Sequence, residues 1–359
     1  MATRSDLAPA HPLVRRVAAL RLRPTALVVV GFASLGLALV LGVGLGSVAV
    51  APGETIAILA NRLLGLDLAR TWSDATETIV MDLRLPRVLT AMVVGTGLAV
   101  AGATFQGLLR NPLADPYVLG TASGAALGAA IAVLIPVRIV VLQFGLLHGL
   151  AFAGALLAVY TVHRLSQTGG LSPLTSLLLT GYAVGSLLAA GLAMAMYLSG
   201  AALGQIFSYL LGGFDGSSWV RLAGAAPIVI AGTVAIGLRA RAINGLLLGE
   251  ETAAHLGIDV SRERAILLAL ASLITAAAVA VSGLIGFVGL VVPHVVRLLV
   301  GPSARLVLPL SAICGAALLA FADLAARMLG EIPVGVVTAV IGAPFFLLLL
   351  RRARAGYEL

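Results

Sequence analysis

Apolar runs of about 20 residues, separated by short polar breaks, recur along almost the whole chain. A helix needs about 20 apolar residues to cross a bilayer, and a helix satisfies its own backbone polar groups there. The pattern therefore predicts an all-α polytopic membrane protein with about ten transmembrane helices. The predicted spans are 25–48, 88–109, 117–136, 140–162, 174–198, 222–239, 263–284, 286–300, 306–328 and 334–350.

The composition supports this fold class. Hydrophobic residues make up 60% of the chain and charged residues 11%, and the mean hydropathy is +1.10, which is far outside the range of soluble globular proteins. Short segments of alternating hydrophobicity are missing, which argues against a porin-like barrel. The single cysteine, Cys314, leaves no disulfide framework or cysteine-based metal site, and we interpret it as a small buried hydrophobe.

All 23 basic residues are arginines, and the formal net charge is +8. Because a Walker A loop needs a lysine to hold nucleotide phosphates, ATP binding by this route belongs to another subunit if transport is driven by ATP. The arginines cluster at the ends of spans, as topology signals do, and this distribution argues against nucleic acid as a partner.

The arginines also predict the orientation of the chain. With the N-terminus in the cytoplasm most of them lie inside, as the positive-inside rule requires for an even number of spans with both termini cytoplasmic. The organisation is then a cytoplasmic tail over 1–24 without a cleavage site, one transmembrane domain over 25–350, and a cytoplasmic tail over 351–359. The arginines expected outside are Arg62, Arg70, Arg84, Arg87, Arg138, Arg221 and Arg327.

One break between spans is short, from Gly283 to Gly289. Reading 263–284 and 286–300 as a single bent span would move the C-terminal arginines outside, so we predict two separate helices. We interpret the glycines here as a packing and hinge feature rather than a phosphate loop.

Two connecting segments predict short helices outside the spans. Residues 51–87 open with an amphipathic helix from Pro52 to about Leu64, followed by a polar stretch that ends at Arg87. In the second segment, 241–264, the acidic residues at 250 and 251 favour a helix start because they meet the positive end of the helix dipole, and a glycine at 257 favours its end. This second helix would lie across the membrane face.

Several motifs follow one another in a fixed order, and the most informative is GATFQGLLRNPLADPYVLG from Gly102 to Gly120. The others are RLPR at 84–87, LLGGF at 210–214, LGEETAAHLG at 248–257, SGLIGFVGLVVPHVVRLLVG at 282–301, ADLAAR at 322–327, EIPVG at 331–335 and GAPF at 342–345. Together they resemble the FecCD-type permease subunits of type II ABC importers, which take up iron-siderophores, haem or vitamin B12. The resemblance extends from about Asp82 to Leu350.

This resemblance implies a type II ABC importer permease fold and a transport role without catalysis. The chain would move an iron chelate or a corrinoid from a substrate-binding protein into the cytoplasm by alternating access. It would bind no cofactor or metal, since ATP and Mg²⁺ belong to a separate ATPase. The implied partners are a second copy of the chain, two ATPase subunits, a periplasmic or lipid-anchored substrate-binding protein and membrane lipid, in a bacterial inner membrane. The motifs leave the cargo open.

The same resemblance assigns two groups of site residues. The short helix of the 241–264 segment would couple to the ATPase. Outward arginines would receive glutamates of the binding protein, although spacing alone favours anchoring to lipid headgroups. The coupling residues are Gly249, Glu250, Glu251, Thr252, Ala253, His255, Leu256 and Gly257, and the docking residues are Arg84, Arg87 and Arg327.

Inside the predicted spans, a few polar residues stand out. Asp323 is an intramembrane acid, and its i+4 neighbour Arg327 predicts a structural ion pair on one helix face. Gln106, Asn111, Pro293 and His294 are assigned to the translocation pathway or its gate, with Gln106 and Asn111 as hydrogen-bond partners between helices. A haem-ligand role for His294 or His148 is the alternative.

Two other functional classes compete with the importer hypothesis. An ion-coupled secondary transporter would need several buried acids or broken ion-binding helices near the midplane, and the sequence offers few. A membrane-embedded enzyme would need clustered ligands or catalytic groups, and the chain shows no such cluster.

Overall fold

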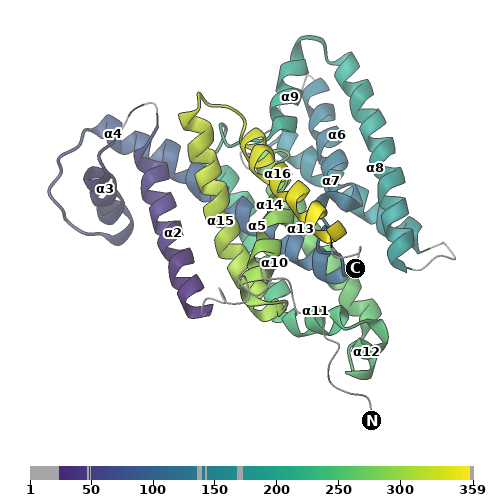
Figure 1. Cartoon of the computed structure of the whole chain (residues 1–359). Helices are drawn as coiled ribbons and strands as arrows, with labels where there is room; N and C mark the ends of the chain where they lie inside the picture. The colour runs from purple at the N-terminus through teal and green to yellow at the C-terminus, as the bar shows by residue number, and fades with distance from the viewer. Residues whose placement is uncertain are drawn as a thin grey trace.

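The computed structural model describes residues 24–46, 48, 50–135, 140–141, 144–167 and 173–355. This part of the chain is almost entirely helical (Figure 1). A two-stranded antiparallel ribbon, β1 (Val140–Val141) and β2 (Phe144–Gly145), pairs Val141 with Phe144.

Each of the ten predicted spans forms a helix. Seven are long and apolar enough to cross a membrane, counting α5 together with the turns that precede it; α6, α14 and the described apolar part of α16 are shorter. The ten are α2 (Pro24–Gly44), α5 (Leu85–Leu108), α6 (Thr121–Leu134), α7 (Leu146–Ser166), α8 (Pro173–Leu198), α10 (Trp219–Leu238), α13 (Val260–Ser282), α14 (Val288–Val300), α15 (Ala304–Met328) and α16 (Val334–Ala355).

Shorter elements connect these helices. The predicted amphipathic helix is confirmed as α3 (Pro52–Leu64). The end of the polar stretch before Arg87 is helical: α4 (Asp74–Thr78) and the π-helical turn η1 (Ile79–Arg84) lead directly into α5. The Ser73 hydroxyl caps α4 by accepting from the Thr76 N–H. The remaining elements are η2 (Pro116–Leu119), η3 (Gly200–Ala202), α9 (Leu203–Leu211), α11 (Ala240–Leu247) and α12 (Glu250–His255).

Helices α5 and α13 form the centre of the bundle, and α15, α14 and α10 pack around α5. Lipid offers apolar side chains no gain from burial in protein, so such helices associate through close packing at small residues. Gly95 of α5 shows this, since a Cβ there would lie 2.2 Å from the Gly315 carbonyl oxygen of α15. Helix α8, in contrast, keeps most of its apolar surface uncovered in the single chain.

The predicted break between α13 and α14 is confirmed. Gly283 ends α13 with φ of 67°, and Phe287 begins α14 with φ of 69°, a left-handed conformation that costs a non-glycine residue on the order of 1 kcal/mol. Tyr117, in the motif from Gly102 to Gly120, holds this break: its hydroxyl donates to the Ile285 carbonyl at 3.0 Å and accepts from the Ile285 N–H at 3.3 Å.

The bundle has two distinct ends. The Asn244 side chain of α11 accepts a 2.7 Å hydrogen bond from the Ala304 N–H, so α15 begins beside α11 and α12. Arg327 follows Ala304 along α15, so at 1.5 Å per residue it lies about 35 Å away. We call these the α12 end and the Arg327 end (Figure 1).

The predicted tails lie mostly outside the described residues, and the domain boundaries remain a prediction. Helix α16 continues through Ala355, past the expected start of the C-terminal tail at 351.

Candidate functional site

The predicted coupling helix is present at the α12 end. Gly249 precedes it with φ of 108°, and Gly257 follows it with φ of 78°; both backbones are left-handed, a region that glycine enters without steric cost. Glu250 and Glu251 occupy the first turn, where the helix dipole favours negative charge. Sequence and structure therefore agree on the helix and its boundaries.

One face of α12 is fixed to the bundle. Glu250 forms an ion pair with Arg264 of α13 and lies 4.0 Å from Arg110, which follows α5. Ala253 is fully buried, and a Cβ at Gly245 of α11 would lie 2.2 Å from the Ile258 side chain. Movement of α12 would thus be transmitted to α13 and to the end of α5.

The opposite face of α12 is open. Glu251, Thr252, His255 and Leu256 are exposed, and 62% of the Leu256 surface is accessible. Leu256 thus offers an apolar contact beside the charged Glu251 and the imidazole of His255. Because the buried face of α12 is fixed to the bundle, this exposed face is a suitable surface for a protein partner.

At the Arg327 end, Asp323 is the centre of a charged cluster. Its carboxylate is fully buried, and it accepts from Arg87 Nε at 2.9 Å and lies 3.1 Å from Arg327 Nε. The predicted Asp323–Arg327 ion pair is therefore confirmed. Arg87 adds two contacts that spacing did not predict: Asp323 from α15, and Asp215 in the loop after α9 at 2.9 Å.

Two arginines of this cluster cap the end of α2. Arg84 donates to the carbonyls of Val43 and Gly44 at 3.1 and 3.0 Å, and Arg327 donates to Gly42 and Leu45 at 2.7 and 3.0 Å. Cations are favoured at the C-terminal end of a helix, where carbonyls lack partners.

These contacts bear on the predicted docking surface. The side chains of Arg87 and Arg327 are 16% and 7% exposed, and Arg84 as a residue is 7% exposed. The three guanidinium groups are engaged within the bundle in this conformation. Their role in binding-protein docking stays a prediction.

The residues assigned to the pathway fall into three places. Gln106 is buried and bridges α5 to α14: its amide donates to the Leu290 carbonyl at 3.2 Å, and its oxygen accepts from Arg297 at 3.0 Å. Its expected role as a hydrogen bond between helices is confirmed. Asn111, in contrast, is exposed and its side chain accepts from the Leu113 N–H within its own turn, so an interhelical role for it is wrong.

Pro293 and His294 lie inside α14. Pro293 is buried, and the His294 ring meets the Phe345 ring of α16 edge to face, with centroids 6.2 Å apart. Among the described residues no group of three or more metal-binding side chains occurs. The structure thus gives His294 a packing contact between α14 and α16, while its gating role stays a prediction.

Sequence reasoning missed Tyr117, Asp215, Arg264 and Arg297 as contributors. Tyr117 lies within the motif from Gly102 to Gly120, and Asp215 directly follows LLGGF. The available signal was a polar residue at the edge of a glycine-rich motif. The partner of Tyr117, Ile285, is 168 residues away, so this contact could not be predicted from spacing.

Comparison with known proteins decides the family. The FecCD transport family matches residues 34–352. The chain belongs to this family. It is 45% identical to the cobalamin import system permease protein BtuC of Halobacterium salinarum over 84% of this chain and 79% of the relative. It is 40% identical to the hemin transport system permease protein HmuU of Yersinia pestis, over 81% and 90%.

A solved structure supports the fold assignment of this FecCD-family chain. It is described as an inward-facing conformation of a metal-chelate type ABC transporter, and it superposes with a TM-score of 0.79 at 28% identity, covering 92% of this chain and 99% of its own. The chain therefore has the type II ABC importer permease fold and is a multi-pass membrane protein. It is a permease subunit of an importer for iron chelates, haem or B12 and is not itself the catalytic subunit.

Proposed function

We propose that this chain forms, as a homodimer, the membrane pathway of an importer that moves one metal chelate or corrinoid by alternating access. Two ATPase subunits would bind at the α12 end, and a periplasmic or lipid-anchored binding protein would deliver cargo at the Arg327 end. The protein would lie in a bacterial cytoplasmic membrane with both termini inside, an orientation that the arginine distribution supports.

The geometry of α12 carries this proposal. Its buried face, through Glu250 and Ala253, is tied to α13 and to the end of α5, and its exposed face is free for a partner. A partner that pushes on Glu251 and His255 would displace the two central helices. Nucleotide-driven closure of an ATPase would thereby change the opening of the pathway.

Helix α8 supports the expectation of a second copy. Tyr182 and Tyr197 are 79% and 85% exposed in the single chain, and Leu187 is 73% exposed. Tyr182 lies well inside α8, where lipid tails would offer its hydroxyl no partner, so a protein neighbour or a water-filled pathway suits this face.

The cargo class is drawn from relatives. Their names cover cobalamin and hemin, and a Bacillus subtilis relative, 37% identical over 79% of this chain and 84% of the relative, is named an Fe(3+)-citrate import permease. We propose an iron chelate, haem or corrinoid as cargo on this basis, without choosing among them.

Uptake by proteoliposomes that contain the chain, its ATPase and its binding protein tests the proposal. Glu251→Trp should raise the ATP hydrolysed per chelate imported at least about tenfold, because a bulky ring disturbs the exposed face of α12 while the buried face stays intact. Asp67→Trp, an exposed acid in the loop after α3, is the matched control and should leave this ratio unchanged. Unchanged coupling in Glu251→Trp would contradict the α12 assignment, and uptake driven by an ion gradient without ATP would contradict the importer.

A further inference from the structure

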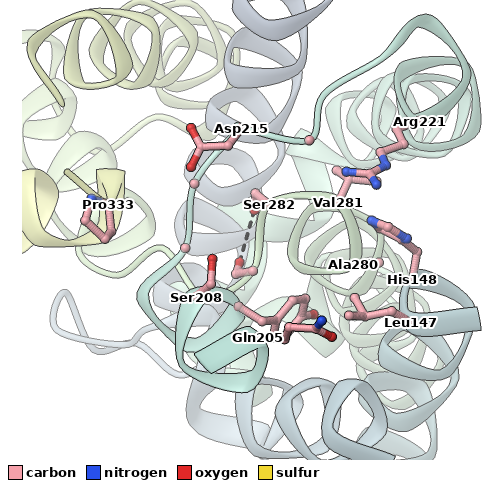
Figure 2. Close-up of a pocket in the computed structure, with 15 residues that line it drawn as sticks. Leu147, His148, Gln205, Ser208, Asp215, Arg221, Ala280, Val281, Ser282 and Pro333 are labelled. Atoms are coloured by element: carbon pink, nitrogen blue, oxygen red, sulfur yellow. Dashed lines mark hydrogen bonds between the residues drawn. The ribbon is translucent and has the colours of Figure 1, made fainter. Parts of the chain in front are cut away.

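A polar cavity of about 210 Å³ lies among α7, α9, α10 and the end of α13. It is lined by His148 from α7, Gln205 and Ser208 from α9, and Arg221 from α10 (Figure 2). At roughly 30 Å³ per water molecule this volume holds about seven waters, or one small organic group.

The cavity belongs to the Arg327 end of the bundle. Asp215, at its rim, is the same carboxylate that binds Arg87 of the charged cluster at 2.9 Å. The cavity is thus on the side opposite α12, where the proposed function places cargo delivery.

Arg221 makes the cavity electropositive. It is half-buried, and the ion pairs of the described residues do not include it. In Figure 2 its guanidinium lies beside the His148 ring, while the Asp215 carboxylate points away from it. A half-buried guanidinium that has no ion-pair partner among the described residues favours an anion from outside the chain.

The backbone reinforces this preference. Arg221 is in the first turn of α10 and His148 in the first turn of α7, two helices of 20 and 21 residues. The positive ends of both dipoles are therefore close to the cavity. Gly216 makes room for the guanidinium, since a Cβ at this position would lie 2.0 Å from Arg221 Nη1.

The donor set suits a carboxylate better than a phosphate. Arginine binds a carboxylate through two parallel hydrogen bonds, and the Gln205 amide and Ser208 hydroxyl supply further neutral donors. One permanent cation balances one negative charge. A phosphate dianion carries both charges on one group and would be under-compensated here, with the Asp215 carboxylate at the rim. A dicarboxylate, in contrast, presents a single charge at each carboxylate.

We propose that this cavity is a binding site for one carboxylate arm of a small metal chelate. The proposal rests on the importer function and narrows its cargo to chelates that carry a carboxylate. Arg221 would bind the carboxylate, and Gly216 would keep the guanidinium in the position that the site needs.

The test is binding of radiolabelled succinate to the full chain in lipid nanodiscs at low ionic strength. Wild type should bind succinate and not the neutral succinamide, and inorganic phosphate should compete poorly. Arg221→Gln should weaken succinate binding at least about tenfold, as loss of charge-assisted hydrogen bonds implies. Arg305→Gln, which removes an exposed arginine at the α12 end, is the matched control and should bind like wild type.

Gly216→Ala keeps every charge and guards against misfolding of Arg221→Gln. Its Cβ would displace the guanidinium, so it should also weaken binding while the purified protein elutes as wild type on size exclusion. Ferric citrate should displace succinate from wild type. Wild-type affinity in both variants, or equal competition by phosphate, would overturn the carboxylate site, and failure of ferric citrate to displace bound succinate would overturn its assignment to a chelate.

This measurement uses neither ATP nor a partner subunit. Loss of the carboxylate site therefore leaves the proposed importer function standing. Loss of ATP coupling in the uptake assay leaves the binding result standing.

Discussion

Asparagine at position 323 would keep the shape of the aspartate side chain and remove the negative charge that lies between Arg87 and Arg327. Asp323 is fully buried and within 3.2 Å of both guanidinium groups. In Asp323→Asn these two cations would face each other across a neutral amide. Arg84 adds a third positive charge close to Arg327.

The size of the effect follows from these contacts. Removing one partner of a buried ion pair typically costs about 3–5 kcal/mol. The amide oxygen of asparagine still accepts one hydrogen bond, Arg87 keeps Asp215, and Arg327 keeps the carbonyls at the end of α2. We therefore expect the lower end, a loss of about 3 kcal/mol in the free energy of unfolding.

Denaturant titration of the purified chain in detergent measures this loss. Asp74→Asn is the matched control: Asp74 is also paired with an arginine, Arg70, but its side chain is 92% exposed, and exposed pairs contribute little. In the double variant Asp323→Asn/Arg327→Gln, part of the stability should return because one uncompensated cation is gone. Equal stability of Asp323→Asn and Asp74→Asn would refute this reasoning.

Two other predictions test the packing and the electrostatics of the bundle. In Gly102→Ala the added Cβ would lie 1.8 Å from the Gly289 carbonyl oxygen, so α5 and α14 must separate, and we expect denaturant titration to show about 1–3 kcal/mol of destabilisation. Gly286→Ala is the control and should cost much less, because its Cβ would point into open space. Equal costs in the two variants would contradict the close approach of α5 and α14. Burial raises the pKa of Asp115, in the loop after α5, from 3.8 to about 6. Because this pKa is higher in the folded state, the contribution of Asp115 to stability is present below pH 4 and is lost as the pH rises through 6. The Asp115 carboxylate caps η2 by accepting from the Tyr117 N–H at 2.8 Å, and an asparagine can keep this hydrogen bond. Asp115→Asn should therefore match wild type at pH 4 and be more stable by up to about 3 kcal/mol at pH 7.5, and parallel stability curves of the two proteins would show that Asp115 is not the cause.

The helices of this protein could be predicted because the apolar pattern is a local property. Each predicted span forms a helix, and even the short break at Gly283 is where the glycines placed it. The helix before Arg87 was not predicted, because its polar residues do not form an apolar run; Ser73 caps a helix there that continues through η1 into α5.

The candidate site was predictable only where its chemistry is local. Glu250 and Gly257 mark a helix start and end within one segment, and Asp323 and Arg327 are one turn apart. Arg87 and Asp323, in contrast, are 236 residues apart, and no spacing rule reaches that far. The sequence therefore identified these arginines at the ends of spans, but not the distant contacts by which they hold the bundle together.

Purification of the tagged chain from its native membrane in mild detergent tests the central claim most directly. The account predicts a stoichiometric Walker-motif ATPase in the eluate, because the exposed face of α12 is its docking surface. A chain recovered without an ATPase, under conditions that keep other such complexes intact, would contradict the account.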